Sequence, residues 1–111
     1  MRQFMTSTVE QRKDFKESFS THPMEVAWAS EAIFFITIEE VKCKGARLKP
    51  KVQISVDGVN WIDEGTVFEP LAERGQYFKR ITHFGGWLRL YIEMEGDDPL
   101  FNLTIHLVMK E

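Results

Sequence analysis

The segment Lys51–Trp61 reads KVQISVDGVNW, and it decides the fold class. Its first half alternates apolar and polar residues, which predicts a β-strand with one apolar face. The pair Asp57-Gly58 then predicts a tight turn, because aspartate and glycine tolerate the backbone conformations of hairpin turns. Trp61 falls on the returning arm. The apolar face of this predicted strand consists of Val52, Ile54 and Val56.

The same period of two recurs along most of the chain, and no segment shows a convincing helical period. We expect six to eight strands. Ala32–Val41 carries apolar residues on both faces near its start, which is typical of a central strand in a two-layer sandwich. The other predicted strands are Phe4–Val9, Met24–Trp28, Gln76–Ile81, Trp87–Met94 and Phe101–Met109.

The last two predicted strands show the clearest alternation. The short linker between them, Glu95-Gly96-Asp97-Asp98-Pro99, has the composition of a hairpin turn. We therefore expect the two strands to pair antiparallel and to bury one face together. The apolar face comprises Leu88, Leu90, Ile92 and Met94 in the first strand, and Phe101, Leu103, Ile105, Leu107 and Met109 in the second.

Three segments are less regular. Gln11–Phe19 fits either a strand or a helix, because Phe15 and Phe19 stand four residues apart. Lys42–Lys51 holds five basic residues and is predicted to be a solvated loop, and Thr66–Gly75 to be a loop or a single helical turn. Residues 1–20 are expected to form an N-terminal arm or edge strands.

The composition limits the architecture. The chain has 111 residues, 43% of them hydrophobic, which suffices for one core and predicts a single domain over residues 1–111. Short strands separated by turns favour one antiparallel β-sandwich of the jelly-roll or Greek-key kind.

The charge and the single cysteine limit the function. The net charge of −3 argues against a nucleic-acid partner. One cysteine excludes an internal disulfide, and neither a signal peptide nor a membrane-spanning stretch is visible. We expect a cytoplasmic or particle-associated protein without a membrane partner. No cofactor is expected.

The pattern Ser55-x-Asp57-Gly58-x-x-Trp61, followed by Trp87–Ile92 (WLRLYI), resembles the strand-turn-strand signature of discoidin-like jelly-roll modules. Related SxDGxxW hairpins occur in small β-sandwich proteins of phage particles. The resemblance covers Lys51–Met94 and implies a non-catalytic role. Discoidin modules are longer, are exported and commonly carry a disulfide, so their ligand-binding loops are not transferred to this chain. The resemblance therefore favours a structural or assembly protein.

The residues that could support chemistry are scattered. The three histidines, His22, His83 and His106, lack the spacing of a zinc site. Cys43 has no identifiable histidine partner, so we do not expect an enzyme. Acidic pairs in predicted turns could supply oxygen ligands to calcium. These calcium candidates are Asp97, Asp98, Asp63 and Glu64.

The strongest binding candidate is the strand face that carries Trp87, Arg89 and Tyr91, because aromatic rings beside a guanidinium suit sugar stacking or a protein partner. Trp61 could be a second platform, and Phe84 precedes the strand in a glycine-containing loop. Alternatively, the same residues cover the edge of the core, with Arg89 paired to Glu39 or Glu93.

Two functions follow from these patterns. The first is a structural or assembly subunit that acts through protein–protein contacts, as a homo-oligomer or within a larger, phage-like particle. The alternative is a carbohydrate-binding module that uses the aromatic and arginine face. A calcium-dependent, lectin-like fragment is a third and more distant reading.

Overall fold

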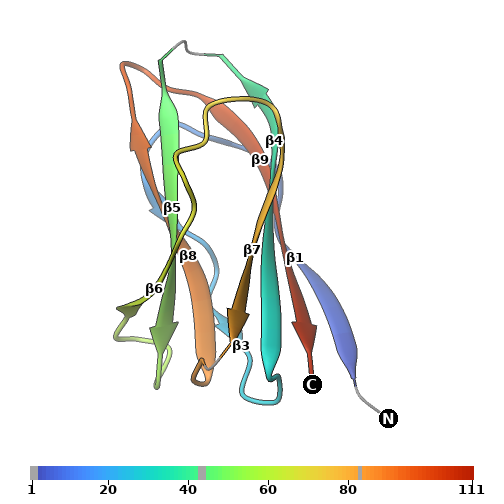
Figure 1. The fold of residues 1–111 in the computed structure, drawn as a ribbon. Coiled ribbons are helices and arrows are strands. Elements are labelled where there is room, and N and C mark those ends of the chain that lie inside the picture. Colours follow the sequence, from blue (N-terminus) through green and yellow to red (C-terminus); the bar gives the residue numbers. More distant parts are fainter. Residues whose placement is uncertain (1–2, 43–44, 83) are drawn as a thin grey trace.

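The structure is a computed structural model that describes residues 3–42, 45–82 and 84–111. These residues form nine strands and no helix, so no helix among them could cross a membrane (Figure 1). The all-β prediction is confirmed. The strands are β1 (Phe4–Phe15), β2 (Phe19–Ser20), β3 (Met24–Glu25), β4 (Glu31–Val41), β5 (Arg47–Ser55), β6 (Ile62–Val67), β7 (Gly75–Thr82), β8 (Trp87–Glu95) and β9 (Phe101–Lys110).

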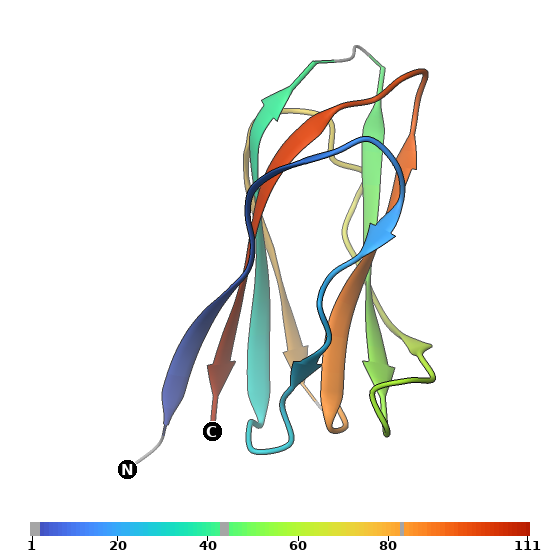
Figure 2. The same cartoon turned by 180° about the vertical axis from the view of Figure 1, so that it is seen from behind.

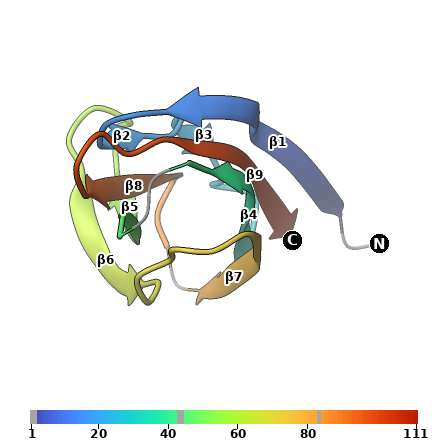
Figure 3. The same ribbon diagram turned by 90° about the horizontal axis from the view of Figure 1, so that it is seen from above.

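The strands form two antiparallel sheets that enclose one core (Figures 1 and 3). Sheet A has the order β1-β9-β4-β7, and sheet B has the order β2-β8-β5-β6 with β3 also paired to β8. When β2 and β3 are counted as one interrupted strand, this is the strand order of a jelly roll. The structure thus selects the jelly roll from the two sandwich types expected. It also places β4 in the interior of its sheet, as predicted.

The strand count exceeds the expected six to eight because one strand is interrupted. Between β2 and β3, the amide of Leu90 donates a hydrogen bond to the hydroxyl of Thr21, at 2.9 Å, instead of to a backbone carbonyl. Pro23 follows and has no amide hydrogen to donate. Of the predicted strand Met24–Trp28, Met24–Glu25 forms β3, and the amide of Val26 still donates to the carbonyl of Gly86 at 2.7 Å.

The core lies between the two sheets and follows the predicted alternation. In β8, Leu88, Leu90 and Ile92 are fully buried. The inward residues of β4 and β9 are also buried. They are Ala32, Phe34, Ile36 and Ile38 in β4, and Phe101, Leu103, Ile105, Leu107 and Met109 in β9.

The predicted hairpin between β8 and β9 is wrong. β8 pairs with β5, β2 and β3, whereas β9 pairs with β4 and β1. The connection after Glu95 arches from one sheet to the other at one end of the sandwich (Figure 1). The two apolar faces therefore meet across the core instead of lying side by side in one sheet. Alternation along a strand reports which face is buried, but it does not report which strand lies beside it.

The basic segment after Lys42 is only partly a loop. β5 begins at Arg47, four residues before the predicted strand, and it buries Leu48 and Pro50. At its other end β5 stops at Ser55, so Val56 is 91% exposed and does not share the buried face of Val52. Lysines within a strand are compatible with pairing when they point to the solvated face.

The N-terminal segment pairs within its own chain. β1 extends to Phe15 along β9, with two shifts of register and a positive φ of 44° at Arg12. The segment Gln11–Phe19, left open from the sequence, is therefore strand up to Phe15, and the Phe15 and Phe19 rings stack with centroids 3.7 Å apart. β1 and β2 each form an edge of a sheet (Figure 2).

Candidate functional site

The loop between β5 and β6 is held by the side chains of Ser55 and Asp57. The Ser55 hydroxyl accepts hydrogen bonds from the amides of Asp57 and Gly58, at 3.2 and 2.8 Å, and donates one to Asp57 Oδ1 at 2.9 Å. The Asp57 carboxylate accepts the amides of Val59 and Asn60 and the side-chain amide of Asn60. These hydrogen bonds within the turn fix the shape of the loop.

Gly58 allows this loop to lie against Trp87. Its φ is +78°, and a Cβ at this position would stand 3.1 Å from Cε2 of the Trp87 indole. A side chain here would be both conformationally strained and crowded. The Ser55, Asp57, Gly58 and Trp87 positions therefore form one structural unit.

Beside this loop, the outer face of sheet B carries a row of interacting side chains, which we call the Trp61 ladder. The Arg89 guanidinium lies 4.4 Å from the centroid of the Trp61 ring. Arg89 Nε donates to the side-chain oxygen Oε1 of Gln53 at 2.8 Å. The side-chain nitrogen Nε2 of Gln53 donates to Asp63 Oδ1 at 3.0 Å. Lys51 binds the other Asp63 oxygen at 3.1 Å and lies 5.5 Å from the centroid of the Tyr91 ring. The ladder consists of Lys51, Gln53, Trp61, Asp63, Arg89 and Tyr91.

The strand register explains the ladder. Gln53 of β5 stands between Asp63 of β6 and Arg89 of β8, and Lys51 stands opposite Tyr91. Side chains opposite one another on neighbouring strands are close enough to interact directly. Three strands that are distant in sequence therefore build one continuous polar and aromatic face.

Hydrogen bonding changes the acidity of both carboxylates in this region. The backbone amides of Asn60 and Val59 hold the pKa of Asp57 well below its ordinary value. The Gln53 amide, followed by Lys51, lowers the pKa of Asp63. Partial burial against Trp61 lowers the pKa of Arg89, because desolvation disfavours the charged form. Since the carboxylate groups are stabilised as anions, neither is prepared to act as a general base near neutral pH.

The structure brings together most of the predicted binding residues. Trp87, Arg89 and Tyr91 share the outer face of β8, and Trp61 joins them from the start of β6. Phe84 is partly buried and packs against the core. The predicted pairing of Arg89 with Glu39 or Glu93 is wrong, because its hydrogen-bond partner is Gln53. Glu39 instead lies on sheet A, where it accepts a hydrogen bond from Thr104 at 2.7 Å.

The calcium candidates do not form one cluster. Asp63 and Glu64 lie in β6, where Asp63 is engaged in the ladder and Glu64 accepts the amide of Thr66. Asp97 and Asp98 lie in the connection between β8 and β9, near the other end of the sandwich (Figure 1). Within the described ranges, no three acids, histidines or cysteines gather as metal ligands. Cys43, Lys44 and His83 lie outside the described residues.

Two features of the surface were not predicted from the sequence. One is Gln53, which links Arg89 to Asp63, because a glutamine in a strand carries no distinctive pattern. The other is the exposure of apolar residues at the β5–β6 loop and at sheet edges. This could have been suspected from the valines that flank Asp57-Gly58, since a tight turn cannot bury them. The exposed large apolar residues are Phe4, Met5, Val56, Val59, Ile62, Val67 and Phe78.

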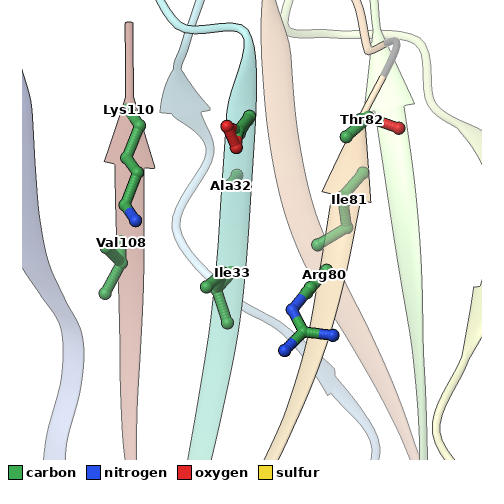
Figure 4. A pocket seen from close by; sticks show the side chains of 8 residues that line it. Ala32, Ile33, Arg80, Ile81, Thr82, Val108 and Lys110 are labelled. Carbon is green, nitrogen blue, oxygen red and sulfur yellow. The ribbon is translucent and has the colours of Figure 1, made fainter. Parts of the chain in front are cut away.

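The outer face of sheet A contains a shallow hollow of about 150 Å³ (Figure 4). Ile33 lies in its middle, with Val108 on β9 to one side and Arg80 on β7 to the other. The Arg80 side chain runs along β7, and Lys110 stands at the β9 side. This hollow is apolar in its floor and charged at its rim.

No family model matches the sequence, and no curated protein matches it by sequence. Solved structures nevertheless share its fold. The SPBc2 prophage-derived protein YomS is similar over 100% of this chain and 96% of its own, with a TM-score of 0.67 and 8% identity. The PBSX exported protein XepA is similar over 98% of this chain, with a TM-score of 0.59 and 7% identity. A chain from infectious bursal disease virus strain Gx is similar over 98%, with a TM-score of 0.58 and 12% identity.

The extent of these similarities differs. This chain spans nearly all of YomS but only 36% of XepA and 32% of the virus chain. At such low identities the comparisons show a shared fold. They agree with the part of the sequence resemblance that pointed to phage proteins. The comparisons do not confirm the discoidin-like part of the resemblance, which stays a prediction.

Proposed function

We propose that this chain is a non-catalytic structural or assembly subunit that acts through protein–protein contacts in a phage-like particle or a related assembly. The observation that carries the proposal is its set of exposed apolar side chains, which gather at sheet edges and at one loop. Val56 and Val59 project from the β5–β6 loop and are 91% and 75% exposed, and Ile62 beside them is 65% exposed. Grouped exposed apolar residues on a small protein are typical of surfaces that bind other proteins.

The shared fold supports the same proposal. The similar structures include a prophage-derived protein, YomS, and a virus chain, and YomS matches the whole chain. The jelly roll also suits assembly, because its two sheets leave edge strands that neighbouring chains can cover.

The ladder supports a non-catalytic role. Its carboxylate Asp63 is bound by both Gln53 and Lys51, and Arg89 is bound by Gln53 and stacked on Trp61. Groups that satisfy one another in this way form a rigid surface, and they leave no activated acid or base in the ladder.

The test is the mass in solution, measured by light scattering coupled to size exclusion at micromolar concentrations. An assembly subunit gives a defined species heavier than the 13.0 kDa chain and does not respond to glycans. The variants Val59→Ser and Trp87→Ala distinguish the loop from the aromatic face. A species that dissociates in Val59→Ser assigns association to the exposed loop. A monomer whose tryptophan fluorescence changes with a sugar would contradict the proposal.

A carbohydrate-binding module is the second candidate, favoured by one observation. Trp61, Trp87 and Tyr91 share one face of sheet B, and such aromatic rings can stack on sugars. Arg89, however, covers one side of the Trp61 ring. A glycan array with the wild type beside Trp61→Ala and Tyr91→Ala tests this candidate, and it is discarded if no glycan binds more weakly to the variants.

A further inference from the structure

The four sheet edges differ in how well they are protected against pairing with another chain. β1 contains two shifts of register and a left-handed Arg12, and β6 contains a register shift and Gly65 with φ of +114°. β2 and β3 have two residues each, with Pro23 between them. Bulges, short strands and prolines are the usual devices that prevent edge-to-edge association.

β7 has no register shift, no proline and no short length, so the cations Lys79 and Arg80 are its remaining protection. Its eight residues pair with β4 in continuous register, from Thr82 opposite Glu31 to Gly75 opposite Ile38. The backbone–backbone hydrogen bonds in the described ranges do not link this strand to any other element. Every second residue of an edge strand directs its amide and carbonyl outward, so β7 presents a regular row of unpaired backbone groups.

The side chains of β7 also leave the edge accessible. Phe78 is 49% exposed and contacts Phe35 of β4, with ring centroids 5.8 Å apart. Arg80 runs along β7, and its guanidinium lies 5.4 Å from the centroid of the Phe78 ring on the same strand (Figure 4). This cation is thus held above its own strand by contact with Phe78.

A groove of about 380 Å³ runs beside this edge. It lies between the segment 68–71 and β7, and Pro70, Tyr77 and Phe78 contribute apolar surface to it. The strand edge therefore offers backbone groups for pairing and a neighbouring groove for the side chains of the incoming strand.

We propose that β7 is a self-association edge, at which β7 of a second copy of this chain pairs antiparallel across a twofold axis centred on Phe78. This inference rests on the proposed assembly function and names its partner. A twofold axis perpendicular to the sheet pairs each residue with one on the same face, so the register must be centred on a residue. The Phe78 register places Phe78 opposite Phe78, Gln76 opposite Arg80, and Tyr77 opposite Lys79.

The two cations of β7, Lys79 and Arg80, favour this register and a second copy of β7 as the pairing strand. With the axis on Phe78, Lys79 meets Tyr77, Arg80 meets Gln76, and the two Phe78 rings meet each other, so no cation lies opposite another. An axis on Lys79 or Arg80 would place two like charges directly opposite, which is destabilising. An axis on Tyr77 also avoids opposed cations, but it pairs only residues 75–79 of the strand, whereas the axis on Phe78 pairs residues 75–81 and so uses almost the whole strand.

The first experiment compares Phe78→Lys with Val67→Lys by light scattering coupled to size exclusion. Val67 is a matched control, because it is an exposed apolar residue (58%) on a different free edge, β6. The wild type is expected at twice the 13.0 kDa chain mass. Phe78→Lys puts two cations on the axis and should give a monomer, whereas Val67→Lys should remain a dimer. Circular dichroism confirms that both variants are folded.

The second experiment tests the register by disulfide formation in a Cys43→Ser background. Residues opposite one another in an antiparallel pair have Cα atoms about 4.5–5.5 Å apart, which suits a disulfide. Phe78→Cys should therefore form a covalent dimer under mild oxidation. Gln76→Cys alone should not, but Gln76→Cys combined with Arg80→Cys should. Thr6→Cys on the β1 edge is the control and should stay monomeric in a denaturing gel.

The outcomes separate this inference from the proposed function. A dimer that survives Phe78→Lys, or that crosslinks through Thr6→Cys and not Phe78→Cys, overturns the β7 interface and leaves the assembly function intact. A wild type that is monomeric throughout the micromolar range also overturns the β7 interface. If that monomer responds to a glycan, the assembly function falls as well.

Discussion

Asp57 is the residue whose charge most affects the β5–β6 loop. Its carboxylate accepts two backbone amides and the Asn60 side chain, and these bonds hold its pKa below the ordinary value of 3.8. Because folding lowers this pKa, the stabilisation is complete above the ordinary pKa and is lost as the pH falls below it.

We therefore expect Asp57→Asn to lower the melting temperature at neutral pH, and the gap to the wild type to narrow as the pH falls below 3.8. Thermal melts followed by circular dichroism between neutral and strongly acid pH measure this. Val56→Thr is the control, since its exposed side chain should not affect the loop at any pH. A gap that stays constant into the acid range would show that the charge of Asp57 does not stabilise the fold.

Gly58 permits a second prediction at the scale of one residue. Gly58→Ala should destabilise more than Gly45→Ala, although the φ angles are similar, +78° and +82°. Both substitutions cost about 1–2 kcal/mol for a left-handed conformation. Only the methyl group at Gly58 meets another side chain, the Trp87 indole at 3.1 Å, whereas Gly45 faces open space. Urea denaturation measures both, and equal losses would contradict a close contact between the loop and Trp87.

At the scale of the element, the interruption between β2 and β3 depends on one hydroxyl. Thr21 is buried, and its hydroxyl accepts the amide of Leu90. Thr21→Val has nearly the same shape but leaves that buried amide without a partner, which costs about 1–3 kcal/mol. Thr21→Ser keeps the hydroxyl and should retain the bond.

Hydrogen exchange of the Leu90 amide, followed by NMR, checks this directly. Its protection should fall in Thr21→Val and persist in Thr21→Ser, apart from the change in global stability. If the amide stays protected in Thr21→Val, another group accepts its hydrogen and the interruption has a different cause.

The elements also show what could be predicted from the sequence. β4, β8 and β9 were predicted closely because each buries one apolar face completely, and alternation records that burial. The arch between β8 and β9 was not, because Gly96, Asp98 and Pro99 suit a hairpin and an arch equally. β5 was shortened in the prediction because the basic residues of Lys42–Lys51 favoured a solvated loop, yet Lys49 and Lys51 stand inside the strand.

In the candidate site, too, features within one strand were predicted and contacts between strands were not. Trp87, Arg89 and Tyr91 were expected on one face, since they alternate within a single strand. The partner of Arg89 was missed because Gln53 stands 36 residues away, and their contact depends on the register between β5 and β8. Contacts within a strand are encoded locally, whereas contacts between strands require the topology.

At the scale of the whole molecule, the two sheets share one core. Ile105 of β9 is fully buried between the sheets, while Trp61 and Trp87 lie on the outer side of sheet B. A jelly roll of this size should unfold in one cooperative transition, because neither sheet can keep its apolar face covered without the other.

Ile105→Ala tests whether the two sheets unfold together. The substitution removes buried methyl groups and should cost about 2–5 kcal/mol. Because the sheets are expected to unfold together, the denaturation midpoint should fall equally for tryptophan fluorescence, which reports in part on sheet B, and for far-UV circular dichroism, which reports on both sheets. His106→Ala, the neighbouring residue on the outer face of β9, should leave both midpoints nearly unchanged. If the fluorescence midpoint stays in place while the circular dichroism midpoint falls, sheet B retains structure without sheet A and the single shared core is refuted.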